Sequence, residues 1–238
     1  MPRHARRLKI RRKDLRKPDE FETLTGQAIG WVGDHLPVVY GVLGLVLLTL
    51  LAGLLLGRWR ASQNEAAGIA FRGAQARFAA GNFPDAEQGF AYVVERYPHT
   101  PYGRLAGLYR AHALAAKGDQ AAAATAYGEY LSRAAGADYL RQEALLGLGR
   151  AKEGAGDSAG ALDAYTQAGA LPGPYRSDAL LGAARLQEAA GHADQAREIY
   201  AGLLKDATDP ATKAFAAAKV PGATQTPGAD GEDAIGAE

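Results

Sequence analysis

The chain has 238 residues, with 27 Lys and Arg against 26 Asp and Glu, a formal net charge of +1. A balance so close to neutral argues against a nucleic-acid-binding protein, which needs a strongly basic surface. Cysteine is absent, which excludes a disulfide framework, thiol catalysis, a cysteine-ligated metal and a lipid anchor on an amino-terminal cysteine. Alanine, the best helix former, supplies 52 residues, so we expect an all-helical protein.

The first 35 residues form a basic segment. Residues 1–35 carry nine Lys and Arg and five Asp and Glu, a net charge of +4. Such a tract is typical of an arm that binds nucleic acid, of a segment that contacts anionic lipid, or of a signal that orients a membrane span. Asp19 and Glu22 have the spacing of a capping box, which predicts a short helix. We expect it to lie flat on the inner headgroup layer with Trp31 inserted, the alternative being a solvated helix beside the membrane.

The next segment, residues 36–57, contains no charged residue. Its sequence, LPVVYGVLGLVLLTLLAGLLLG, has 22 residues, which as a helix measure ~33 Å and cross a bilayer. Arg58, Trp59 and Arg60 follow it, where a cleavable signal peptide would have small residues, so we predict a transmembrane helix. The basic residues before it favour an amino terminus in the cytoplasm and a carboxyl domain outside, although Arg58 and Arg60 favour the reverse.

Small residues mark one face of the predicted transmembrane helix. Thr49, Gly53 and Gly57 stand four residues apart and therefore lie on the same side of a helix. Two glycines in GxxxG spacing allow a second helix to approach closely, so these positions are candidates for packing against a membrane partner. Glycine is also common in membrane helices generally, which is the alternative.

Residues 58–219 contain a fourfold repeat with spacings of 37, 38 and 35 residues. Each repeat has a glycine in a turn context, an alanine five residues later, an aromatic residue nine later and a small residue seven earlier. The columns are Gly81, Gly118, Gly156 and Gly191; Ala86, Ala123, Ala161 and Ala196; Phe90, Tyr127, Tyr165 and Tyr200; and Ala74, Ala111, Gly149 and Ala184. The glycine ends a helix in the left-handed conformation, and the ring fills the space between one hairpin and the next. We therefore expect four stacked helical hairpins, followed by a short capping helix at residues 211–219.

This pattern resembles the tetratricopeptide repeat, a helix–turn–helix unit of about 34 residues that stacks into a superhelix. The third repeat matches best, through Leu148-Gly149, Gly156-Asp157, Ala161 and Tyr165. The resemblance covers about residues 62–210, although the early tryptophan of the consensus is missing and the linkers are slightly long. It implies an all-α fold, a tetratricopeptide-like α-solenoid of about four helical hairpins, and the predicted transmembrane helix precedes it.

The order of the parts adds a second resemblance. A short tail, one anchor and about four repeats, with the stretch TPYGRLA at residues 100–106, is similar to the bacterial ancillary SecYEG translocon subunit family. That resemblance implies a single-pass inner-membrane protein with a periplasmic repeat domain, whose partners are translocon subunits and periplasmic chaperones. The alternative is an accessory or assembly subunit of another membrane protein complex.

A solenoid of this kind has a concave groove lined mainly by the first helix of each hairpin. We predict that two sets of residues line it. One is the polar residue six positions before each turn glycine, and the other is the acid three positions before each of the last two turn glycines. The residues are Gln75, His112, Arg150, Glu153, Arg185 and Glu188. An apolar row, Phe71, Leu108, Leu146 and Leu181, either lies beside them or belongs to the core between repeats, which is the role that we expect for Leu108, Leu146 and Leu181. The mixture suits an extended peptide or a partner helix. Pairing of Arg150 with Glu153 and of Arg185 with Glu188 within their own helices is the alternative role of the charges.

Motifs for catalysis are missing from the sequence. The five histidines have no metal-ligand spacing, and the sequence has no HExxH or GxxxxGK[ST] motif. We therefore predict no catalytic, cofactor-binding or metal-binding residue, no small-molecule substrate and no enzymatic activity. Residues 220–238, with four acids and little apolar content, are predicted to be a disordered acidic tail.

Overall fold

The computed structural model describes residues 26, 29–133 and 138–220, which are helical apart from turns and short connections. The chain divides into two compact units, residues 1–59 and residues 60–238. The basic tract, the Asp19–Glu22 pair and nearly all of the predicted acidic tail lie outside the described residues.

The first unit contains the apolar run. Residues 29–34 are helical, a turn follows at His35, and the rings of Trp31 and His35 stack with their centroids 4.7 Å apart. Helix α2 (Leu36–Ala79) then extends over 44 residues. Its apolar side chains are exposed; Leu47 and Leu54, for example, are each 67% exposed. Within the described part of the chain, α2 is the one helix that is long and apolar enough to cross a membrane.

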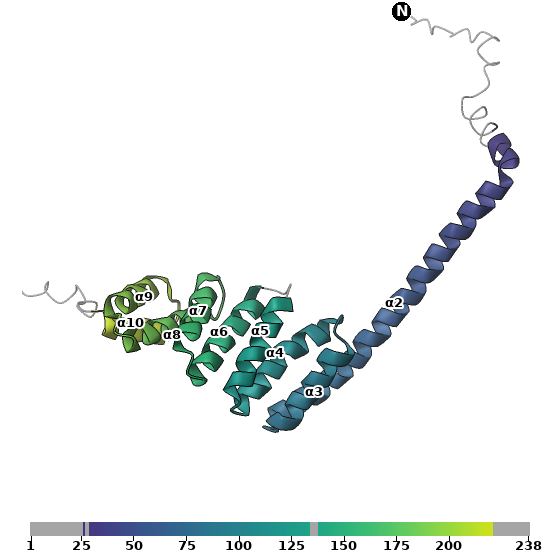
Figure 1. The fold of residues 1–238 in the computed structure, drawn as a ribbon. Helices are drawn as coiled ribbons and strands as arrows, with labels where there is room; N and C mark the ends of the chain where they lie inside the picture. The colour runs from purple at the N-terminus through teal and green to yellow at the C-terminus, as the bar shows by residue number, and fades with distance from the viewer. Residues whose placement is uncertain (1–25, 27–28, 134–137, 221–238) are drawn as a thin grey trace, which may run out of the picture. The chain divides into compact units, whose positions relative to one another are not determined.

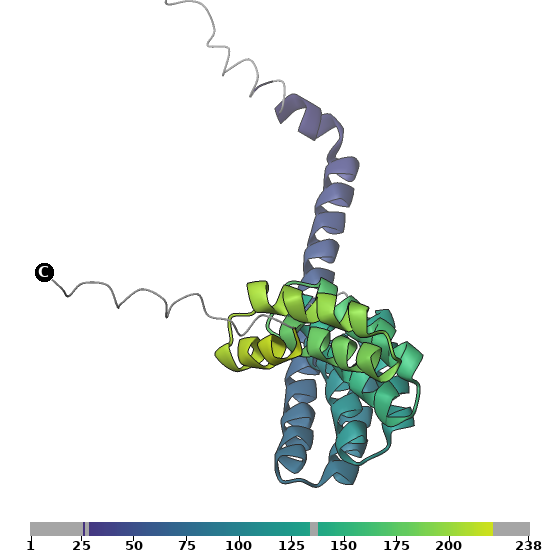
Figure 2. The ribbon, with the colours of Figure 1, turned by 90° about the vertical axis from the view of Figure 1, so that its left-hand side faces the viewer.

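The second unit consists of helical hairpins. Residues 60–79 of α2 pack against α3 (Phe83–Arg96) as hairpin 1, as the 5.4 Å separation of the Phe71 and Phe90 rings shows. The remaining helices are α4 (Pro101–Ala116) and α5 (Gln120–Arg133), which form hairpin 2; α6 (Asp138–Gly154) and α7 (Ser158–Ala170), which form hairpin 3; α8 (Arg176–Ala189) and α9 (Ala193–Asp206), which form hairpin 4; and α10 (Pro210–Lys219). Consecutive helices from α3 to α10 pack side by side (Figure 1), and α10 lies against α9 (Figure 2). The expected stack of four hairpins and its capping helix are confirmed.

The four turn glycines adopt the conformation that the sequence predicts. Gly81, Gly118, Gly156 and Gly191 have φ angles of +76°, +91°, +85° and +82°. Residues with a Cβ rarely adopt this region, so glycine reverses the chain there at little cost. In hairpin 3 the next residue, Asp157, caps α7 by accepting the backbone N–H of Gly160 at 2.9 Å.

The aromatic column joins each hairpin to the next. Its four rings are at most 3% exposed. The ring of Tyr165 lies between its own hairpin and hairpin 4: a Cβ placed on Gly149 would lie 2.5 Å from it, and one on Gly182 would lie 2.9 Å from it. The ring therefore packs directly against the two glycines, one on each side, which confirms that the aromatic column fills the space between hairpins.

The first helices lie on the inner side of the stack. Helix α4 contacts α6, and α6 contacts α8, more closely than successive second helices contact one another in the described chain. A row of helices that pack more closely on one side curves toward that side. The first helices of hairpins 2–4 therefore line the inner face of this unit.

A buried glutamine fixes the connection between hairpins 3 and 4. Gln142 of α6 has no exposed surface. Its amide nitrogen donates to the carbonyl oxygens of Ala168 at 3.1 Å and Leu171 at 2.8 Å, and its amide oxygen accepts the N–H of Tyr175 at 3.1 Å. One side chain thus pairs two backbone groups of the connection, the Leu171 carbonyl and the Tyr175 N–H, and adds a second bond to the Ala168 carbonyl, which also accepts the N–H of Leu171 at 3.3 Å.

Candidate functional site

The inner face of hairpins 3 and 4 contains a cleft of about 780 Å³, which we call the inner cleft. Its charged residues are Arg150, Glu153, Asp178, Arg185, Glu188 and Lys219. Its apolar and aromatic lining includes Tyr165, Leu181, Tyr200 and Phe215. The structure therefore brings four of the six predicted groove residues together, on the helices α6 and α8.

The charged residues pair between elements. Arg185 of α8 donates to both carboxylate oxygens of Glu153 on α6, with an Nη2–Oε2 distance of 2.8 Å. Arg150 of α6 reaches Asp178 of α8, with an Nη2–Oδ2 distance of 3.3 Å. The sequence-based alternative, pairing of Arg150 with Glu153 and of Arg185 with Glu188 within their helices, is therefore wrong.

The last pair of the cleft involves the capping helix. Lys219 of α10 donates to both carboxylate oxygens of Glu188, at 3.1 and 3.0 Å. The other two pairs, Arg185–Glu153 and Arg150–Asp178, form between neighbouring hairpins because α6 and α8 contact one another directly. The three cations and three carboxylates of the inner cleft balance, so the cleft does not select strongly by net charge.

Two buried tyrosines connect the ion pairs to the core. The hydroxyl of Tyr165 donates to Glu153 at 2.9 Å, and that of Tyr200 donates to Glu188 at 3.2 Å. Burial, together with the adjacent carboxylate, raises the pKa of Tyr165 and that of Tyr200 to about 12. The Arg185 guanidinium holds the pKa of Glu153 below its ordinary value, and the Lys219 ammonium does the same for the pKa of Glu188. Both acids are therefore ionised at neutral pH and held in fixed orientations.

His112 and Gln75 lie outside the inner cleft. His112 lines a neighbouring cleft of about 250 Å³, which shares Arg150 with the inner cleft. Its Nδ1 lies 2.7 Å from the Tyr127 hydroxyl and its Nε2 lies 3.1 Å from Glu143, so both ring nitrogens are engaged. Gln75 is exposed on α2, and no described cleft includes it.

The apolar row divides between the core and the groove. Leu108 is fully buried, and Phe71 and Leu146 are 4% and 3% exposed, so these three belong to the core between repeats. Leu181, which we expected in the core, is only half-buried and lines the inner cleft. Together with Phe215, which is 50% exposed, it offers an apolar contact beside the charged pairs.

Three cleft residues were not identified from the sequence: Asp178, Phe215 and Lys219. Asp178 lies in the first turn of α8, where an acid is explained equally well by the helix dipole. Phe215 and Lys219 belong to the capping helix, whose place against hairpin 4 depends on tertiary packing. In the described ranges, no group of three or more His, Asp and Glu side chains is arranged to hold a metal ion.

Comparison with known families identifies the fold. The sequence profile described as "Tetratricopeptide repeat-like domain" matches residues 31–169, and a tetratricopeptide repeat profile matches residues 178–209. The chain belongs to the tetratricopeptide repeat-like family. Tetratricopeptide repeats are typically non-catalytic scaffolds that bind other proteins, and the inner cleft lies on the face that the first helices of the repeats form. No curated protein matches the chain in sequence.

Solved tetratricopeptide structures share the fold. The MamA protein superposes with a TM-score of 0.54 and 18% identity, covering 65% of this chain and 82% of its own. The nearly identical TPR-like repeats of a Podosopora anserina protein assigned to the kinesin light chains give a TM-score of 0.53 and 18% identity, covering 68% of this chain and 87% of their own. A single-substitution variant of those repeats gives the same TM-score and identity, over 68% and 86%.

Proposed function

We propose that this protein is a membrane-anchored tetratricopeptide scaffold that binds protein partners at the outer face of a bacterial inner membrane. The observation that carries the proposal is the inner cleft, whose charged groups are ordered by ion pairs between elements and whose lining includes Leu181 and Phe215. Ordered donors and acceptors beside apolar side chains suit an extended peptide or a partner helix. In this role the chain would need no catalytic, cofactor or metal site and no small-molecule substrate.

The proposed anchor is the apolar run at residues 36–57, with residues 1–35 in the cytoplasm as a basic tail that contacts the lipid headgroups. Residues 58–219 form the repeat domain on the outer side, and residues 220–238 form an acidic tail. The family profile begins at residue 31, so the apolar run lies inside the matched region together with three hairpins. Protease treatment of spheroplasts tests the orientation: the carboxyl domain should be cleaved, and its protection would reverse the topology.

The first partners to test are translocon subunits and periplasmic chaperones. The anchor would hold the inner cleft beside the exit of newly translocated chains, and this raised local concentration makes a weak groove effective. Crosslinking of the tagged chain in native membranes, followed by mass spectrometry, tests the proposal. Channel subunits and periplasmic folding factors are the expected products. A stoichiometric set of subunits from one unrelated membrane complex would contradict the translocon role.

A second candidate is an accessory or assembly subunit held through its membrane helix. A Cβ built on Gly53 or Gly57 meets no described atom within 4 Å, as is also true at Gly41 and Gly44, so larger residues fit at all four positions without a clash inside the described chain. The hydroxyl of Thr49 donates to the Val46 carbonyl at 2.8 Å, so Thr49 contributes a small surface rather than an unpaired donor. Replacing both glycines by leucine should release the chain from such a complex, and the same replacement at Gly41 and Gly44 is the control. Equal retention of both variants would exclude this face.

A further inference from the structure

A second cleft lies on the opposite face of the repeat domain from the inner cleft. It has a volume of about 310 Å³ and lies over α4, between α3 and α5. Arg110 of α4 lines it, whereas His112 lines the neighbouring cleft of the inner face. Arg110 and His112 are two positions apart, and on an α-helix this separation turns the side-chain direction by about 200°. The two side chains therefore leave α4 on opposite sides. We call this second site the outer cleft.

The outer cleft combines an apolar floor with a cationic rim. Val94, Gly107 and Ala126 contribute to the floor, and Tyr130, which is 8% exposed, closes one side. A Cβ on Gly107 would lie 3.5 Å from the Tyr130 ring and would fill part of the cleft, so the glycine leaves this space open. Three arginines, Arg104, Arg110 and Arg133, line the same cleft together with His99 and one carboxylate, Glu129.

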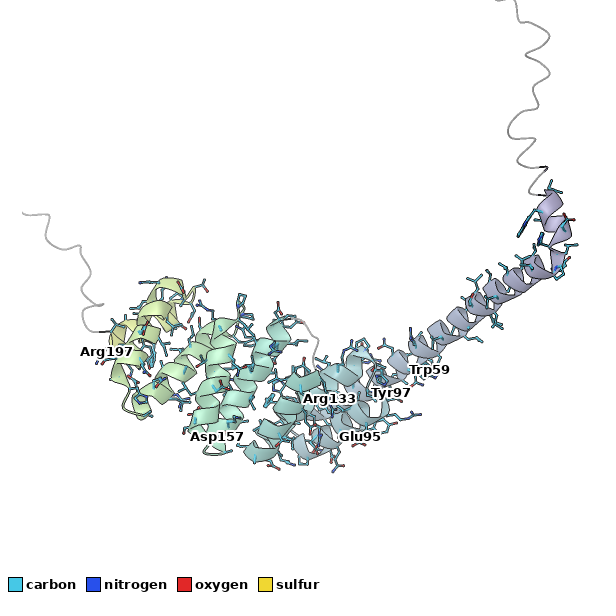
Figure 3. The ribbon with its side chains drawn as sticks, turned by 45° about the horizontal axis from the view of Figure 1, so that its top comes forward. Trp59, Glu95, Tyr97, Arg133, Asp157 and Arg197 are labelled. Atoms are coloured by element: carbon cyan, nitrogen blue, oxygen red, sulfur yellow. The ribbon has the colours of Figure 1, made fainter. Side chains whose placement is uncertain are left out.

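In the inner cleft each arginine forms an ion pair with a carboxylate, whereas in the outer cleft only one of the three arginines does so within the described residues. Arg110 is oriented by Glu87 of α3, with an Nε–Oε1 distance of 2.9 Å. None of the carboxylates in the described chain forms an ion pair with Arg104 or Arg133. Arg133 projects from the end of α5, where it is labelled in Figure 3, and both side chains belong to exposed residues. Their guanidinium groups therefore keep free donors at the rim.

We propose that the outer cleft binds a short acidic peptide segment of a protein partner, with carboxylates on Arg104 and Arg133 and an aliphatic side chain on the apolar floor. A planar guanidinium matches a carboxylate in two parallel hydrogen bonds, which favours this ligand. A membrane surface fits less well because it is broad and flat, whereas the floor of the outer cleft is recessed and small. This site is independent of the inner cleft, so the scaffold would hold two partners on opposite faces.

The test uses the full chain in neutral detergent and the capped, dye-labelled peptide Glu-Leu-Glu-Glu-Leu-Glu, with Gln-Leu-Gln-Gln-Leu-Gln as its uncharged match. Fluorescence anisotropy should show binding of the acidic peptide and not of the uncharged one. The double variant Arg104→Gln/Arg133→Gln should weaken binding about tenfold. Two control variants should leave the affinity for the acidic peptide unchanged. They are Arg72→Gln/Arg141→Gln, at exposed arginines outside the outer cleft, and Arg185→Gln, in the inner cleft.

Three results would overturn the proposal. They are absence of binding by the unmodified chain at millimolar peptide, equal binding of the uncharged peptide, and unchanged affinity of the Arg104→Gln/Arg133→Gln variant. Binding of vesicles that contain anionic lipid, lost in that variant while the peptide fails to bind, would assign the cleft to lipid instead. Circular dichroism of each variant distinguishes loss of the site from loss of the fold.

Discussion

The packing of the Tyr165 ring against Gly149 and Gly182 provides a direct test of how hairpins 3 and 4 are joined. Gly182 lies in α8 of hairpin 4, and a Cβ added there would lie 2.9 Å from Cε2 and 3.0 Å from Cδ2 and Cζ of the Tyr165 ring. The ring has no room to move away, because its other side faces Gly149 at 2.5 Å by the same measure. Gly182→Ala therefore adds volume to a filled space, which destabilises a protein by about 1–3 kcal/mol.

The same substitution also raises helix propensity, which stabilises by about 1 kcal/mol. Gly202 of α9 isolates this effect, since a Cβ there meets no described atom within 4 Å. We expect Gly202→Ala to raise the free energy of unfolding by about 1 kcal/mol. Gly182→Ala should be neutral or destabilising, leaving a difference of about 1–3 kcal/mol between the variants. Urea unfolding of the full chain in detergent, followed by circular dichroism, measures it, and equal stabilisation by both substitutions would refute the packing argument.

Three further predictions concern other structural positions. Gln142→Leu removes the side-chain partners of the Leu171 carbonyl and the Tyr175 N–H, so the free energy of unfolding should fall by about 2 kcal/mol; a loss no larger than that of an exposed surface substitution would contradict the assignment. Gly156→Ala forces a Cβ into the left-handed region and should destabilise by about 1–2 kcal/mol, measured by thermal unfolding beside Gly128→Ala, whose Cβ meets open space. Because the pKa of Glu153 is lowered in the folded state, its contribution to stability is present above the ordinary glutamate pKa of 4.5 and is lost as the pH falls below it. Glu153→Gln should therefore flatten the loss of stability in acid, and an acid limb as steep as that of the unmodified chain would count against the ion pair.

The repeat architecture could be predicted from the sequence because its determinants are local. A turn that needs a left-handed residue selects glycine whatever surrounds it, so Gly81 and Gly118 mark hairpins directly. The aromatic column was equally clear, since each ring has one fixed distance from its turn glycine. Leu108 and Leu146 of the apolar row were correctly expected in the core, whereas Leu181, expected there too, lines the inner cleft.

The partners of the charged side chains could not be predicted in this way. Arg185 lies within reach of Glu188 on its own helix, yet it contacts Glu153 of the preceding hairpin at 2.8 Å. Which of two carboxylates a long side chain reaches depends on the distance between neighbouring first helices, and spacing along one helix does not contain that distance. Lys219 was missed for the same reason, because the capping helix contributes to the inner cleft only through its packing on hairpin 4.

The central claim, that the inner cleft is where a protein partner binds, is tested most directly by site-specific photocrosslinking in native membranes. A photoreactive phenylalanine analogue at Leu181 lies in the inner cleft, and the same analogue at Thr166 lies on an exposed position of α7 outside it. We expect one or a few defined protein adducts from position 181 and none of these from position 166. Identical adducts from both positions, or none from position 181 while the chain still purifies with its partners, would contradict the claim.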